Sequence, residues 1–168
     1  DTVLMNTAGV RQVTETGKGV FIGIVDSGFD LTHPMFRDAS GNLRVESLLE
    51  QKADQSAPTE FTTAQLTTGW ANGSNPGADS VGHGTHVGGI AAGTKHQGFE
   101  GIAPDARFLL VKTNFFDTTD GAKWIFTKAG TKPCVVNMSL GGHWGPHDGA
   151  SVEETALDQI CGPGKIVV

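Results

Sequence analysis

Two side chains stand where they could do chemistry together: a carboxylate that ends an apolar run and an imidazole that opens a glycine-rich one. Asp26 closes "VFIGIVD", and His83 lies in "VGHGTHVGGIAAG". The partial positive charge of a helix N-terminus disfavours an imidazolium there unless a carboxylate lies opposite. We therefore expect Asp26 to contact His83. An Asp that holds a His in one tautomer supplies two members of an acyl-transfer triad.

The tetrapeptide "HGTH" also has other interpretations. By itself it fits a satisfied, partly buried histidine pair in a glycine-rich turn. A zinc site is disfavoured, because His83 and His86 are three apart with no Glu between them, and no further ligands have metal spacing. A dinucleotide-binding turn is excluded by placement, because Gly17, Gly19 and Gly23 precede or interrupt the apolar run instead of following it.

The elements that must position these side chains alternate along the chain. Continuous apolar runs predict four parallel strands, and the segments between them predict three helices. Strands alternating with helices predict a doubly wound α/β fold, with a mainly parallel sheet, helices on both faces and sites at the carboxyl ends of strands. The strands are expected at 20–25, from 106, from 134 and from 165, and the helices at 85–92, 120–129 and after 151.

Local signals mark the helix ends. Ser151 and Glu154 predict a capping box for the last helix, and Asp120 is expected to cap the preceding one, which Gly130 closes. Residues 37–82 are polar and weakly periodic, and we interpret them as a surface insertion with one helix or hairpin around 43–51. A role in contacting substrate is the alternative for this stretch.

Composition limits the possible partners. The chain has 168 residues, which fits one domain, and its net charge of −6 with a pI near 5.4 leaves no basic face for nucleic acid or an anionic membrane. It has no apolar run of membrane-spanning length and no signal-peptide pattern at its start, as expected of a mature or trimmed N-terminus. Cys134 and Cys161 are either free thiols or one disulfide.

Four segments, in this order, resemble the subtilisin-like serine proteases, or subtilases: "IVDSGFDLTHPMF", "GHGTHVGGIAAG", "GIAPDARFLLVKT" and "VVNMSLGG". The resemblance runs from about Thr7 to Val168, with residues 37–80 poorly matched. It implies that residues 1–168 are the N-terminal part of one subtilisin-like peptidase domain, incomplete at its C-terminus and carrying the polar insertion at about 37–82.

The resemblance also implies roles for the catalytic positions. Asp26 matches the family's catalytic Asp and His83 its catalytic His, and His86 would be structural. The family's nucleophilic Ser and oxyanion-binding Asn have no counterpart and are expected beyond Val168, so the chain alone should be inactive. Ser139 is not the nucleophile we expect, because "NMSLG" lacks the first glycine of a GxSxG turn.

Substrate-binding positions follow in the same way. Ser139, Leu140 and Gly141 match the segment that pairs with an extended peptide substrate. Asn114 and Phe115 fall where the family has the opposite edge of the substrate site, although "NFFDTTD" matches less well.

No cofactor is expected. The family's calcium site is not supported, because Met35 stands where an acidic ligand is expected and "TKHQ" at 94–97 is short and lacks Asn or Asp. The expected partners are a peptide or protein substrate and the C-terminal portion of the same domain, either continuous with this chain or a separate docked fragment.

The resulting hypothesis is a serine endopeptidase that acts through an acyl-enzyme. The alternative is an inactive, pseudoprotease-like peptide-binding module. A lipase-like hydrolase is disfavoured, because its triad runs Ser, acid, His, whereas here the acid precedes the His. Secretion is the family's commonest setting, and intracellular members exist.

Overall fold

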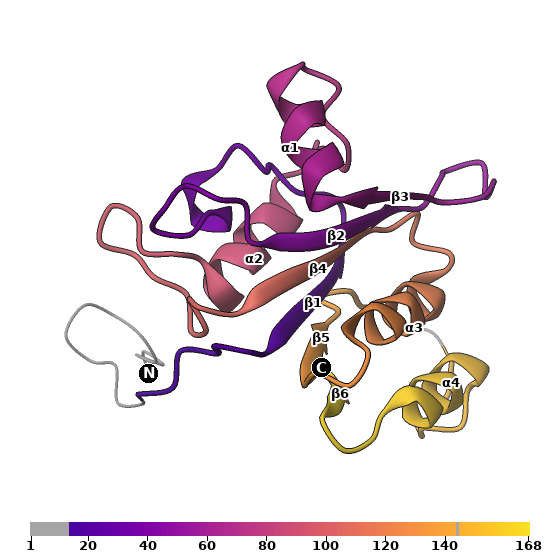
Figure 1. Cartoon of the computed structure of the whole chain (residues 1–168). Coiled ribbons are helices and arrows are strands. Elements are labelled where there is room, and N and C mark those ends of the chain that lie inside the picture. Colours follow the sequence, from indigo (N-terminus) through magenta and orange to yellow (C-terminus); the bar gives the residue numbers. More distant parts are fainter. Residues whose placement is uncertain (1–13, 144) are drawn as a thin grey trace.

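The computed structural model describes residues 14–143 and 145–168 and has helices on both faces of one sheet (Figure 1). The start of the resemblance at Thr7 and the N-terminal residues lie outside the described ranges. The elements in chain order are β1 (Phe21–Asp26), the 3-10 turn η1 (Pro34–Phe36), β2 (Val45–Glu50), β3 (Thr59–Thr62), α1 (Thr63–Ala71), α2 (His83–Ala92), β4 (Arg107–Lys112), α3 (Thr118–Ala129), β5 (Cys134–Asn137), α4 (Val152–Ile160) and β6 (Lys165–Val167).

The described strands form a six-stranded sheet in the order β3-β2-β4-β1-β5-β6. The four strands expected from apolar runs are β1, β4, β5 and β6, and neighbouring members pair in parallel. Strand β1 lies between β4 and β5, with Asp26 opposite Lys112 at the carboxyl end of the β1–β4 ladder. The prediction of a doubly wound, mainly parallel α/β fold is confirmed.

The central strands are buried on both faces, which explains why their sequences are continuously apolar. Neighbouring residues of β1 serve different cores: Ile24 packs on the side of α1 and α2, and Val25 packs on the side of α3 and α4. Strand β4 repeats this pattern with Leu110 and Val111. Both cores therefore hold β1 in place, and the position of its final residue is well defined.

The interpretation of residues 37–82 as a surface insertion is wrong for β2. This strand pairs in parallel with β4, and Val45 and Leu48 are fully buried. Strand β3 pairs with β2 in antiparallel orientation and forms the edge of the sheet. Leu66 of α1 is also buried. The stretch looks polar because only a few apolar residues face the core, and they are separated by exposed segments such as 53–58.

A buried arginine precedes β2 and was not anticipated. The Arg44 guanidinium donates to the carbonyl oxygens of Ala106 at 2.6 Å, Met35 at 2.7 Å and Ala92 at 2.6 Å. Burial lowers the pKa of Arg44 to about 10, and attraction to Asp105 opposes that shift. The Arg44 guanidinium thus caps the C-terminal end of α2, where the helix dipole favours positive charge.

The helix ends follow the local signals in part. The capping box of Ser151 and Glu154 at the start of α4 is confirmed. Gly130 ends α3, but Asp117 takes the N-cap position and Asp120 lies in the first turn, so the predicted start was late. No helix in the described ranges is long and apolar enough to cross a membrane.

Both cysteines are free thiols. Cys134 is buried in β5, where burial raises its pKa to about 11, and Cys161 is exposed after α4. The disulfide alternative therefore does not apply to this structure.

Candidate active site

Asp26 is a buried carboxylate at the carboxyl end of β1. Its side chain is 1% exposed. The backbone N–H of Ser27 donates to its Oδ1 at 2.7 Å. A buried carboxylate needs such donors to remain charged. The end of β1 therefore holds the Asp26 carboxylate, a hydrogen-bond acceptor, in a fixed orientation.

His83 is the first residue of α2, so the helix begins two residues before the predicted start at 85. The helix can approach β1 because position 84 has no side chain: a Cβ on Gly84 would overlap the Gly28 carbonyl oxygen and lie 2.9 Å from Asp26 Cβ. Small residues thus bring the N-terminus of α2 onto the end of β1.

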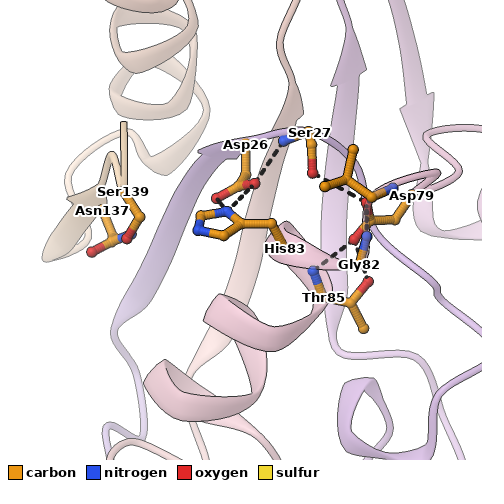
Figure 2. Close-up of polar contacts among 9 residues, drawn as sticks. Asp26, Ser27, Asp79, Gly82, His83, Thr85, Asn137 and Ser139 are labelled. Carbon is orange, nitrogen blue, oxygen red and sulfur yellow. Dashed lines mark hydrogen bonds and ion pairs between the residues drawn. The ribbon is translucent and has the colours of Figure 1, made fainter. Parts of the chain in front are cut away.

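The contact between His83 and Asp26 is short, and it involves both carboxylate oxygens of Asp26. His83 Nδ1 lies 2.8 Å from Asp26 Oδ1 and 3.0 Å from Oδ2, so the predicted proximity is confirmed (Figure 2). With Nδ1–H donating to the carboxylate, the neutral ring keeps Nε2 as its proton acceptor. The His83 side chain is 48% exposed, so that nitrogen is accessible.

The pair also changes the acidity of the imidazole. The hydrogen bond to Asp26, and then the negative charge of Asp26, raise the pKa of His83 above its ordinary value of 6.5, against a smaller opposing effect of burial. A ring that is held in one tautomer and takes up a proton more readily is suited to general base catalysis. The arrangement can accept a proton and return it.

Asp79 completes the polar network, and the sequence analysis missed it. Its Oδ1 accepts from Gly82 N at 2.8 Å and from the Ser27 hydroxyl at 3.1 Å, and its Oδ2 accepts from Thr85 N at 3.0 Å and Thr85 Oγ1 at 2.8 Å (Figure 2). A possible sequence signal was an Asp shortly before a helix start that lacks a Ser, Thr, Asn or Asp cap.

His86, expected to be structural, has an exposed side chain. Its backbone N–H donates to Gly82 O as part of the first turn of α2. Its side chain lines an apolar groove of about 750 Å³ beside α2, together with Ile90 and Phe99. Ile90 is 59% exposed and Phe99 is 82% exposed.

The expected substrate-pairing segment follows β5. Ser139 and Gly141 are exposed, and Leu140 is half-buried against the core of α3 and α4. Within the described part of the chain, the Ser139 hydroxyl bonds with Asn137 Nδ2 at 2.9 Å and not with His83. In Figure 2 Ser139 and Asn137 lie on the side of His83 that faces away from Asp79.

The opposite edge, after β4, is arranged differently. The Asn114 side chain is used in hydrogen bonds within its own loop and to the loop after β2: Nδ2 donates to Asp117 Oδ2 and to Lys52 O, and Oδ1 accepts from two backbone N–H groups. Phe115 is 59% exposed and has a φ of +66°, a conformation that is unusual for an aromatic residue. Of the two predicted residues, Phe115 presents its side chain to solvent and Asn114 shapes the loop.

Met35, which stands where an acidic calcium ligand was expected, belongs to the core. Met35 is 6% exposed, and its carbonyl oxygen accepts hydrogen bonds from Arg44 and from Thr94 N. Within residues 14–143 and 145–168, no three His, Cys, Asp or Glu side chains are grouped so that they could hold a metal ion.

The model of the subtilase family matches residues 17–168, which is most of the chain and includes both Asp26 and His83. The chain belongs to the subtilase family. This subtilase chain is 30% identical to subtilisin-like protease PopC of Myxococcus xanthus, over 92% of the chain and 30% of PopC. It is also 30% identical to subtilisin E of Bacillus subtilis, over 90% of the chain and 34% of that protein.

The fold agrees with this family. The subtilase chain superposes on the CspB protease of Clostridium perfringens with a TM-score of 0.78 and 28% identity, over 91% of the chain and 35% of CspB. The chain thus spans about a third of the length of these relatives.

Proposed function

We propose that the protein containing this chain is a serine endopeptidase that hydrolyses peptide bonds through an acyl-enzyme. The contact of 2.8 Å between His83 Nδ1 and Asp26 is the observation that carries the proposal. A buried carboxylate and an exposed imidazole in this geometry are the orienting acid and the general base of a triad. Family membership supports this reading of the pair.

In the proposed reaction, His83 Nε2 takes the proton of a serine hydroxyl as the oxygen attacks the substrate carbonyl carbon. The imidazolium, held by Asp26, gives that proton to the leaving amine when the C–N bond breaks. Water then attacks the ester, and His83 repeats the two transfers. The serine and an oxyanion-binding Asn lie in a part of the protein outside this chain, so the chain alone is expected to be inactive.

We further propose that substrate lies between two exposed segments. Residues 139–141 follow β5 and would pair with an extended peptide backbone. On the other side, the loop after β4 would contact substrate through the exposed ring of Phe115. Both segments follow the carboxyl ends of strands beside β1, as expected of a site in this fold.

The remaining part of the domain is the proposed partner of the apolar surface beside α2. Val81 is 72% exposed, Ile90 59% and Phe99 82%, and the latter two line the groove of about 750 Å³. Exposed apolar side chains that gather beside one helix typically mark an interface. The relatives are about three times longer than the matched region, so a further portion of the domain is a consistent occupant.

A fluorophosphonate label on the full-length protein tests the proposed activity. We expect label on a serine outside residues 1–168 and release of peptide products. His83→Ala should abolish both, whereas the control His147→Ala, an exposed imidazole in the loop before α4, should retain both. Label on Ser139 would contradict the assignment. Peptide binding without hydrolysis, unchanged by His83→Ala, would favour the binding module.

We also propose that the protein is secreted, the common setting of the family. Fractionation of the source cells, with immunodetection of the full-length protein, should find it outside the cytoplasm. Detection only in the cytoplasm would contradict this.

A further inference from the structure

The first turn of α2 has no cap of its own. Its N-cap residue is Gly82, which has a φ of +88° and no side chain to accept a hydrogen bond. The first backbone N–H groups of a helix need acceptors from elsewhere. The turn that carries His83 therefore needs a hydrogen-bond acceptor from a residue outside the helix to hold it in place.

Asp79 supplies an acceptor for one of these groups, Thr85 N, and also binds the two residues just before the helix. Its Oδ2 accepts from Thr85 N and Thr85 Oγ1, and its Oδ1 accepts from Gly82 N and from Val81 N at 3.1 Å. One carboxylate therefore binds the residues on both sides of His83. The imidazole itself is left to bond with Asp26.

The same carboxylate reaches the end of β1. The Ser27 hydroxyl donates to Asp79 Oδ1 at 3.1 Å, while the Ser27 backbone N–H donates to Asp26 Oδ1. Thr85 adds a second connection, because its Oγ1 accepts from Asp30 N at 2.9 Å. The end of β1 and the first turn of α2 are thus joined through the Asp79 carboxylate and, beside it, through the hydrogen bond between Asp30 N and Thr85 Oγ1.

We propose that Asp79 is a positioning residue of the peptidase site: its carboxylate joins the first turn of α2 to the end of β1 and so holds the His83 ring against Asp26. The inference rests on the proposed function, because positioning matters only if His83 transfers protons. A small displacement of a catalytic group costs about 100-fold in rate.

The charge of Asp79 supports the geometry. Burial opposes its ionisation, but hydrogen bonds from Thr85, Gly82 and Val81 outweigh burial and keep the pKa of Asp79 below its usual value. The charged groups that face His83 are Asp26 from β1 and Asp79 from the loop before α2. Asp26 is the main cause of the raised pKa of His83, and the negative charge of Asp79 adds to it.

The test compares Asp79→Asn and Asp79→Ala in the full-length protein. The matched control is Asp38→Asn, because Asp38 also accepts two backbone N–H groups, from Ser40 and Asn42, but is exposed and lies beside Arg44, near the other end of the strands. The pKa of His83 is measured by NMR titration of labelled histidine, with His83→Gln for assignment. The kinetic constants kcat and KM for a peptide substrate are measured across pH.

We expect Asp79→Asn to lower the pKa of His83 and to reduce kcat about tenfold, because the shape is kept while the charge and one of the two acceptor oxygens are lost. Asp79→Ala should reduce kcat about 100-fold with KM within about twofold. Asp38→Asn should leave the pKa of His83 and kcat at wild-type values.

The proposal is overturned if His83 titrates as in wild type and kcat is unchanged in both Asp79 variants, or if Asp38→Asn has an equal effect. Should Asp79→Ala fail to fold, Asp79→Asn decides the question. If the wild-type protein does not hydrolyse peptides, the proposed function fails, and the titration of His83 still decides whether Asp79 positions the ring.

Discussion

Helices α2 and α4 have similar lengths but begin in opposite ways. The start of α4 is capped locally by Ser151 and Glu154, and none of its residues is fully buried. The start of α2 has no local side-chain cap, and a glycine in its first turn packs directly on β1. A helix that only covers a core can be specified by its own sequence, whereas a helix that presents a reactive group depends on residues from other elements.

The largest expected effect comes from breaking the contact that distinguishes α2. Asp26→Asn in the full-length protein should reduce kcat about 10⁴-fold, as loss of the orienting carboxylate does in a serine protease triad. It should also lower the pKa of His83, because the hydrogen bond to Asp26 is the main cause of the raised value. Steady-state kinetics and histidine NMR would measure both.

The sign of the pH dependence follows from the same shift. His83 must be unprotonated to act as a base, so the acidic limb of kcat/KM in wild type should lie above pH 6.5 and move to lower pH in Asp26→Asn. Because the folded-state pKa is raised, the stability from the pair is fully present below pH 6.5 and declines as pH rises through the pKa of His83. If the acidic limb of kcat/KM lay at the same pH in Asp26→Asn as in wild type, Asp26 would not be the cause of the raised pKa of His83.

The next effect comes from the close approach of α2 to β1. Gly84→Ala should destabilise the fold by about 3 kcal/mol, because its Cβ would meet the Gly28 carbonyl oxygen and Asp26 Cβ, neither of which can move freely. Gly162→Ala, after α4, is the matched control, because its Cβ would have no neighbour within 4 Å. Urea denaturation of both variants measures the difference. Equal stability would show that α2 can shift without cost.

The same contrast explains what could be predicted from the sequence. Asp26 could be placed because it directly follows a continuous apolar run, which marks the carboxyl end of a buried strand. Ser151 could be placed because its capping partner, Glu154, is three residues away. The role of Asp79 was only half visible: an Asp shortly before an uncapped helix start is a local signal, but its contact with Ser27 joins residues that are distant in the chain. Arg44 was missed for a related reason: its acceptors are carbonyl groups from three separate segments of the chain, which have no sequence signature.

A smaller effect is expected from weakening the connections made by Thr85. Thr85→Val keeps the shape but removes the hydroxyl that donates to Asp79 and accepts from Asp30 N. The expected loss is about 1–2 kcal/mol, together with a modest fall in kcat. Thermal unfolding and peptide kinetics would measure the two. A loss of stability with unchanged kcat would show that Thr85 supports only the fold.

The smallest effect should come from the local cap of α4. Ser151→Ala removes the acceptor of Glu154 N at 3.2 Å and should cost about 1 kcal/mol. Because α4 lies on the opposite face of the sheet from α2, neither the pKa of His83 nor kcat should change. Urea denaturation, histidine NMR and peptide kinetics on one preparation would test this. If Ser151→Ala changed the titration of His83, helix starts on the two faces would be coupled through the sheet, and the local cap of α4 would not be independent of the site.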